Sequence, residues 1–283
     1  MKFKHPQAFI WVPPGISSEE ALKRTTHLSI GAHPDDLEFM SFHGIESCYE
    51  SKDSFYTGIV VTDGAKSVKA GPYQNMSPEQ MARVRIEEQL KAAKLGKYNA
   101  LIMLQYSSAD LLSSSKGVRP WIQEIKKIFS YCNPHTLYSH NPFDKHPSHL
   151  AVILPLLQLL QKLEPKRKPK KFYACEVWRG LDWVLEQDRI ALALGKPALS
   201  KKINLLFQSQ IDAGKNYAEA VKGRRIANAT FSNPHETDAA SQIELALDLT
   251  SLMHRTRDQI FPYLKAILSR FEKDLTKNIQ RYL

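Results

Sequence analysis

The sequence predicts an α/β fold: a Rossmann-like, mainly parallel sheet with flanking helices and a helical C-terminal region. Three observations support this prediction. Short apolar runs alternate with longer helical patterns over the first 180 residues, which is typical of strand–helix–strand units. The runs are rich in β-branched and aromatic residues, as expected for strands buried on both faces. Beyond residue 200 the strand signals fade and helical patterns dominate.

Five of the apolar runs are predicted to be strands. They cover residues 28–32, 56–62, 100–104, 136–139 and 172–177. A turn at Pro13-Pro14-Gly15 precedes a short helix that Ser17 is expected to cap.

Longer helical patterns separate the predicted strands. One begins at Ser77-Pro78, an N-cap serine followed by a proline, and stops at Gly96. Two more are expected around residues 121–129 and over 149–163. The last third is expected to be helical over 201–227, 238–253 and 256–282. These patterns divide the chain into an N-terminal extension (1–25), an α/β catalytic domain (26–200) and a helical C-terminal region (201–283) packing on the same domain.

Composition excludes several classes of protein. Hydrophobic residues make up 43% of the 283 residues, and no apolar stretch reaches the roughly 18–20 residues of a membrane span. The N-terminus lacks the apolar segment of a secretory signal. The odd number of cysteines, three, argues against a disulfide framework. We therefore expect a cytoplasmic protein without a membrane span.

The formal net charge of +10 has two interpretations. The densest basic run, residues 166–171, is typical of a solvated loop. The alternative is electrostatic attraction of an anionic substrate. No nucleic-acid-binding motif accompanies the charge, so nucleic acid is not expected as a partner.

Histidines and carboxylates follow two of the predicted strands. His33, Asp35 and Asp36 come directly after the first strand, and His146 and His149 come shortly after the fourth. Open parallel sheets carry their reactive groups at the carboxyl ends of the strands, so the two segments can converge. A catalytic zinc needs three nitrogen or oxygen ligands and one open position for water.

His33, Asp36 and His149 can supply that ligand set. Asp35 is then left beside the water, where a carboxylate can act as general base. His146 lies three residues before His149 and can share a helical face with it. From there it could stabilise an oxyanion and help protonate a leaving amine.

These residues resemble the motifs of the LmbE-like (PIG-L) family of zinc-dependent de-N-acetylases. The resemblance rests on Ala32-His33-Pro34-Asp35-Asp36 and on His146-Pro147-Ser148-His149. Thr62-Asp63-Gly64 is similar to the family's Thr-x-Gly turn. The helix that carries Arg85-Ile86-Glu87-Glu88 and ends in Leu95-Gly96 is similar to its Arg-x-x-Glu helix. The resemblance covers residues 26–180 or so.

The resemblance implies a hydrolase that removes the N-acetyl group from an acetylated amino sugar, such as an N-acetylglucosamine conjugate. By match to the motifs, the zinc ligands would be His33, Asp36 and His149. Asp35 would be the general base and His146 the electrophilic partner. Another divalent metal such as Fe²⁺ would suit the same ligands.

The resemblance also suggests which further residues contact the substrate or orient the site. Arg85 and Asp63 are candidate substrate-binding residues. Ser148 stands where the family usually has an aspartate between the two histidines, and Leu37 separates the aspartate pair from a glutamate. Asp144 is the candidate orienting carboxylate in place of the absent aspartate. The expected partner is a small acetylated amino sugar, and a homo-oligomer is also compatible with the sequence.

Three alternatives remain open. The same hydrolytic chemistry could act on a non-sugar amide. A non-catalytic Rossmann-like binding protein is disfavoured for dinucleotides, since residues 31–35 hold one glycine where the phosphate fingerprint needs three. A basic nucleic-acid binder would need no metal and would leave the histidine and aspartate motifs without a role.

Overall fold

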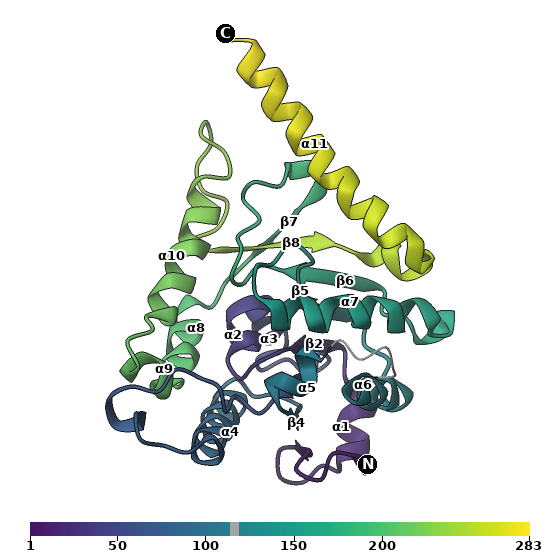
Figure 1. Ribbon diagram of the computed structural model, residues 1–283, viewed down its shortest axis with the longest axis vertical. Coiled ribbons are helices and arrows are strands. Elements are labelled where there is room, and N and C mark those ends of the chain that lie inside the picture. Colours follow the sequence, from purple (N-terminus) through teal and green to yellow (C-terminus); the bar gives the residue numbers. More distant parts are fainter. Residues whose placement is uncertain (114–118) are drawn as a thin grey trace.

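The fold is centred on one eight-stranded sheet with helices on both faces (Figure 1). The computed structural model describes residues 1–113 and 119–283. The strands lie in the order β1-β4-β3-β2-β5-β6-β8-β7. Their bounds are β1 Phe9–Trp11, β2 His27–Gly31, β3 Tyr56–Thr62, β4 Ala100–Tyr106, β5 Thr136–His140, β6 Lys171–Cys175, β7 Ile190–Ala193 and β8 Ile243–Asp248.

The five central strands, β2 to β6, run parallel to one another, as predicted. The chain places β3 and β4 on one side of β2 and then places β5 and β6 on the other side. The crevice between the carboxyl ends of β2 and β5 is therefore a topological switch point, where open α/β sheets bind ligands. β1 and β8 pair antiparallel to their parallel neighbours, β4 and β6, and β7 pairs antiparallel to β8.

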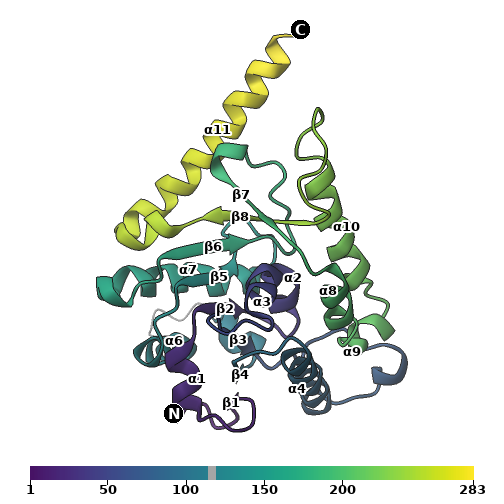
Figure 2. The ribbon, with the colours of Figure 1, turned by 180° about the vertical axis from the view of Figure 1, so that it is seen from behind.

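Helices cover both faces of the sheet, and each face has its own apolar core. The helices α1, α6 and α7 cover one face, whereas α3, α4 and α8 cover the other (Figures 1 and 2). β3 is buried along its whole length because both faces are covered. The helix bounds are α1 Ser18–Arg24, α2 Asp36–Met40, α3 Phe42–Cys48, α4 Pro78–Leu95, α5 Ser108–Leu112, α6 Pro120–Tyr131, α7 Pro147–Lys162, α8 Pro197–Asn204, α9 Gln208–Asp212, α10 Tyr217–Thr230 and α11 Ile260–Gln280.

The structure confirms the predicted start and end of α4. The Ser77 hydroxyl accepts a hydrogen bond from the Gln80 N–H, and Pro78 occupies the first turn. The helix ends at Gly96, but Gly96 keeps a right-handed backbone and Lys97 adopts the positive φ of 52°. Glycine is needed at position 96 for space, because a Cβ atom there would lie 2.6 Å from the Tyr98 ring.

The prediction of a helix over 238–253 is wrong. Residues Ile243–Asp248 form β8, and a short 3-10 helix, Thr250–His254, follows. Leu245 and Leu247 pack in one core and Ala246 in the other, which is the alternation of a strand. The apolar and alanine-rich segment resembles a helix in sequence, but pairing with β6 decides its conformation.

Two edge strands and the division of one helical region were not predicted. β1 adds a strand from the first 25 residues, and β7 adds one at the far edge. The predicted helix over 201–227 is divided among α8, α9 and α10. Both ends of the chain thus contribute strands to the central sheet, while the division at residues 25 and 200 stays a prediction.

The final helix, α11, extends away from the body of the molecule (Figures 1 and 2). Its first turns pack on the core through Leu264 and Ile267. Leu275 and Ile279, farther along, are about half exposed. None of the helices in the described residues is long and apolar enough to cross a membrane.

Candidate functional site

The loop after β2 turns sharply to bring His33 and Asp36 together. The Asp36 carboxylate accepts a hydrogen bond from the His33 backbone N–H at 2.7 Å, and its Oδ2 lies 3.2 Å from the His33 Nδ1. Asp35, at the N-terminus of α2, has a φ of 88°. Such left-handed backbone is unusual for a residue other than glycine and is concentrated at functional sites.

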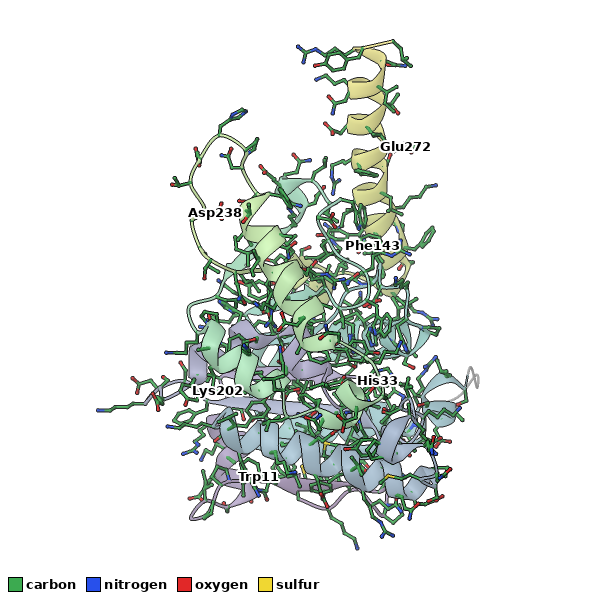
Figure 3. All side chains as sticks on the ribbon, turned by 90° about the vertical axis from the view of Figure 1, so that its left-hand side faces the viewer. Trp11, His33, Phe143, Lys202, Asp238 and Glu272 are labelled. Atoms are coloured by element: carbon green, nitrogen blue, oxygen red, sulfur yellow. The ribbon has the colours of Figure 1, made fainter. Side chains whose placement is uncertain are left out.

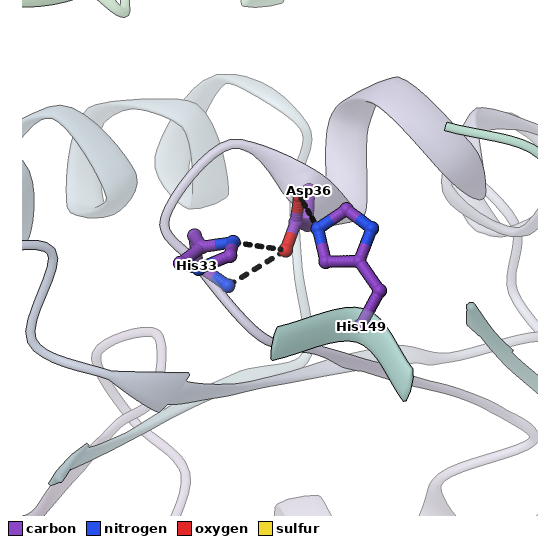
Figure 4. Close-up of side chains that lie close together, drawn as sticks. All are labelled: His33, Asp36 and His149. Atoms are coloured by element: carbon purple, nitrogen blue, oxygen red, sulfur yellow. Dashed lines mark hydrogen bonds and ion pairs between the residues drawn. The ribbon is translucent and has the colours of Figure 1, made fainter. Parts of the chain in front are cut away.

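His149 from α7 joins this pair across the switch point (Figure 4). Its Nε2 lies 3.4 Å from the Asp36 Oδ1. One ligand atom each from His33, Asp36 and His149 lies within 4.8 Å of the others. Two nitrogen donors and one oxygen donor at this spacing form a candidate metal site. The structure therefore brings together the three residues that the sequence indicates as ligands.

The buried Asp144 carboxylate orients His149. Its Oδ2 lies 3.0 Å from the His149 Nδ1 and accepts the proton of that nitrogen. The lone pair of Nε2 is then directed at the site, and this buried nitrogen has no hydrogen-bond partner among the described residues. An unpartnered imidazole nitrogen beside a carboxylate is the donor set that a divalent metal requires. The residues present therefore fit a metal ion.

Negative charge dominates the base of the site. Burial raises the pKa of Asp36, but His149, His140 and His33 outweigh burial and hold it well below its usual range. Burial lowers the pKa of His149, whereas Asp36 and Asp144 raise it to about 9. A divalent cation attracted by the same carboxylates would displace the Nε2 proton of His149, since a metal binds the neutral imidazole.

His140 is part of this site, although no sequence pattern predicted its role. Its ring stacks on the His149 ring with centroids 3.8 Å apart and an angle of 11°. Its Nε2 accepts a hydrogen bond from the Ala32 N–H at 2.9 Å. His140 is the last residue of β5, next to the switch point. Its position at the carboxyl end of a predicted strand is the one sequence feature that could have indicated a place in the site.

His146 caps the N-terminus of α7. Its Nδ1 accepts a hydrogen bond from the Ser148 N–H at 3.2 Å, so the proton of the neutral ring lies on Nε2. Burial, and then the neighbouring His149 and His33, lower the pKa of His146 to about 4. The ring is thus a neutral hydrogen-bond donor. Asp144 contacts His146 only at the backbone N–H, at 3.2 Å, and gives its other oxygen to His149.

Asp35 and Arg85 form a buried ion pair. The Arg85 Nη2 lies 2.5 Å from the Asp35 Oδ2, and Nη1 lies 2.6 Å from Glu88. Burial raises the pKa of Asp35 to about 6 although Arg85 opposes the shift. The Gln89 side chain accepts the Asp35 backbone N–H and fixes the strained residue. Arg85 lines the cavity, and its guanidinium is already engaged by two carboxylates and by the Pro34 carbonyl.

Asp63 belongs to a turn at the edge of the site. Its Oδ1 accepts the Ala65 N–H at 2.9 Å, as in an Asx turn. Gly64 of this turn lines the cavity, whereas Asp63 is not among the described residues that line it. Gly64 has a φ of 72°, and a Cβ atom there would lie 3.0 Å from the Arg85 side chain.

A cavity of about 620 Å³ lies over the candidate metal site. One wall is aromatic: Trp178 packs against Tyr217, whose ring lies 5.7 Å from that of Phe39. Trp178 also lies 5.6 Å from the His146 ring. The C-terminal region supplies part of this wall through α10. A volume of this size suits a small organic ligand.

Comparison with known proteins agrees with the site. Residues 28–158 match the family model described as PIG-L, GlcNAc-PI de-N-acetylase. No curated protein matches the sequence. The matched segment contains the loop after β2, α4 and the start of α7, which hold all of the candidate ligands.

Solved structures share the fold at low sequence identity. N,N'-diacetylchitobiose deacetylase from Pyrococcus horikoshii is 14% identical with a TM-score of 0.64; the match covers 82% of this chain and 86% of that chain. The deacetylase of the A40926 pseudoaglycone is 14% identical with a TM-score of 0.58, over 80% and 97%.

A hydratase also has this fold. The 4-carboxy-2-hydroxymuconate hydratase from Pseudomonas putida is 13% identical with a TM-score of 0.60, over 80% of this chain and 96% of that chain. The fold is therefore common to more than one reaction, and the motifs of the matched segment carry the assignment. Over residues 28–158 this chain is therefore similar to the PIG-L (LmbE-like) de-N-acetylases, and it shares its fold with two deacetylases.

Proposed function

We propose that this protein is a zinc-dependent hydrolase that removes the acetyl group from an acetylated amino sugar or its conjugate. The observation that carries the proposal is the convergence of His33, Asp36 and the unpartnered Nε2 of His149 at the base of a cavity. The match of residues 28–158 to the de-N-acetylase family model supports the reaction type. The aromatic wall of Trp178 and Tyr217 supports a ring-shaped substrate.

A bound zinc ion would supply a Lewis acid and lower the pKa of a water molecule. Asp35 would accept the proton of the attacking water, and its position in the cavity lining next to Asp36 supports this role. Arg85 fixes the position of its carboxylate. Water adds to the acetyl carbon as this proton moves to Asp35.

His146 supplies the second polar group of the proposed reaction. The hydrogen bond from the Ser148 N–H leaves the proton of a neutral ring on Nε2, from which it can form a hydrogen bond to the developing oxyanion while staying on His146. The C–N bond then breaks, the proton held by Asp35 passes to the leaving nitrogen, and acetate and a free amine are released. Ser148 thus contributes its backbone N–H to the site rather than a carboxylate.

Acetate release tests this proposal. The full chain would be stripped of metal, reloaded with zinc or ferrous iron, and incubated with N-acetylglucosamine derivatives and with N-acetylated non-sugar amines. We expect about one metal ion per chain, as in a catalytic site with three protein ligands, and release of acetate only from the reloaded protein. If acetate is released only from the N-acetylated non-sugar amines, the substrate is a non-sugar amide and not an acetylated amino sugar.

The hydratase with the same fold defines the main alternative. If the reloaded protein hydrates an unsaturated carboxylic acid and releases no acetate from any amide, the de-N-acetylase proposal is wrong. Binding of sugars without turnover would instead indicate a binding protein.

The cytoplasmic location and self-association are separate predictions. Light scattering during gel filtration tests self-association.

A further inference from the structure

The cavity over the candidate metal site is strongly basic. Among the described residues, two carboxylates line it, Asp35 and Asp36, and both lie at its base. Asp35 is paired with Arg85, and Asp36 lies among three histidines. The other basic side chains of the lining therefore have no negative partner among the described lining residues; they are Lys66, Lys145, Lys215 and Arg224.

The four basic residues come from separate parts of the fold. Lys66 follows β3, Lys145 precedes α7, Lys215 lies between α9 and α10, and Arg224 is on α10. Convergence of four segments on one cavity differs from a basic run such as 166–171, whose neighbouring charges follow from the sequence alone.

The three lysines form no ion pair within the described residues. Other lysines of the chain do, as in the pair between Lys97 and Glu50. Arg224 differs from the lysines, because its guanidinium donates a hydrogen bond to the Val177 carbonyl. That contact holds its charge at the cavity.

Positive charges gathered around a concave site repel one another and raise the local concentration of anions. A divalent metal would add to this potential at the base of the cavity. A substrate with a negatively charged substituent would relieve the repulsion and form charge-assisted hydrogen bonds with the ammonium and guanidinium groups.

We propose that Lys66, Lys145, Lys215 and Arg224 form a subsite for an anionic substituent, a phosphate ester or a carboxylate, on the substrate. This inference rests on the proposed function for the identity of the reacting group. The acetamide would lie at the base of the cavity near His146, and the anionic substituent would lie toward these four basic side chains.

Binding of sugars that cannot be deacetylated tests the subsite without turnover. Glucose 6-phosphate, glucuronate and glucose would be titrated calorimetrically into the zinc-loaded full chain at low and at physiological ionic strength. We expect at least one of the two anionic sugars to bind more than about tenfold more tightly than glucose, a difference of about 1.4 kcal/mol. Comparison of the phosphate with the carboxylate identifies the preferred anion. The preference should weaken as salt increases.

The Lys66→Gln, Lys215→Gln double variant removes two of the charges, and Lys202→Gln is the matched control. Lys202 is exposed on α8, does not line the cavity and lies well apart from His33 (Figure 3). We expect the double variant to lose most of the anion preference and the control to keep it.

Two results would overturn the subsite. One is equal binding, or no binding, of glucose and both anionic sugars. The other is an anion preference that survives the double substitution, which would mean that the anion binds the metal. If the preference depends on the lysines but no acetylated sugar releases acetate, the subsite stands and the proposed reaction fails.

Discussion

Asp144 and His149 form a buried pair in which Asp144 Oδ2 lies 3.0 Å from His149 Nδ1. The pair fixes the tautomer that directs the His149 lone pair at the candidate metal site. Asp144 also accepts the His146 backbone N–H, so a single carboxylate positions the loop and the ligand. Carboxylates of this kind typically strengthen metal binding because they increase the basicity of the histidine.

Replacing Asp144 should weaken metal binding without removing a ligand. For Asp144→Ala we expect zinc affinity to fall by about 10–100-fold. Competition with a chromophoric chelator measures the change. Asp53→Ala, in an exposed loop, is the control and should bind zinc as the wild type does. Unchanged affinity in Asp144→Ala would show that His149 needs no partner.

Replacing His149 should abolish the site. For His149→Ala we expect less than about a tenth of the zinc that the wild type holds, because a tridentate protein site is reduced to His33 and Asp36. Elemental analysis after gel filtration measures the ratio. Circular dichroism of the variant must match that of the wild type for the comparison to be valid. Full zinc occupancy in the variant would rule out His149 as a ligand.

Replacing Asp35 should separate metal binding from turnover. Asp35→Asn keeps the shape of the side chain but cannot accept a proton, so kcat should fall by about 10²–10⁴-fold while zinc content stays at the wild-type ratio. Acetate release and elemental analysis on the same preparation measure both. Retained turnover on a proven substrate would exclude Asp35 as the general base.

Removing Arg85 should destabilise the fold. The Arg85 side chain is 1% exposed and pairs with Asp35 and Glu88, so Arg85→Met leaves two carboxylates without their cation. We expect the free energy of unfolding to fall by about 3–5 kcal/mol. Urea denaturation measures it, with Arg83→Met on the exposed face of the same helix as control. A change below about 1 kcal/mol, the size typical of surface ion pairs, would contradict a buried ion pair.

His27 should make stability depend on pH. Burial, and then His43 and His135, lower its pKa from 6.5 to about 4 in the folded chain. The unfolded chain therefore binds more protons between these values, and stability should fall as pH decreases from 6.5 toward 4. His27→Gln should reduce this slope in urea denaturation at several pH values, whereas His235→Gln, on the surface, should not. Equal slopes in both variants would contradict the lowered pKa.

Local patterns in the sequence were sufficient to predict the central strands and the candidate ligand motifs. Local signals suffice for them: apolar runs define β2 to β6, a serine and a proline start α4, and His33 and Asp36 lie three residues apart on one loop. The position of both segments after parallel strands predicted that the loop and His149 converge, and the resemblance to the family implied the same ligand set. The five parallel strands and the candidate ligand set could be predicted because each depends on a pattern of neighbouring residues.

Features that depend on contacts between distant segments could not be predicted from local sequence patterns. Residues 243–248 form a strand because β6 offers an unpaired edge, and no local signal reports that edge. Asp144 orients His149 rather than the His146 ring because the turn of the loop brings that nitrogen within 3.0 Å. The basic lining of the cavity could not be predicted from the sequence either. Lys66 and Lys215 are far apart in the chain, and they line one cavity only because the C-terminal helices fold over the carboxyl edge of the sheet.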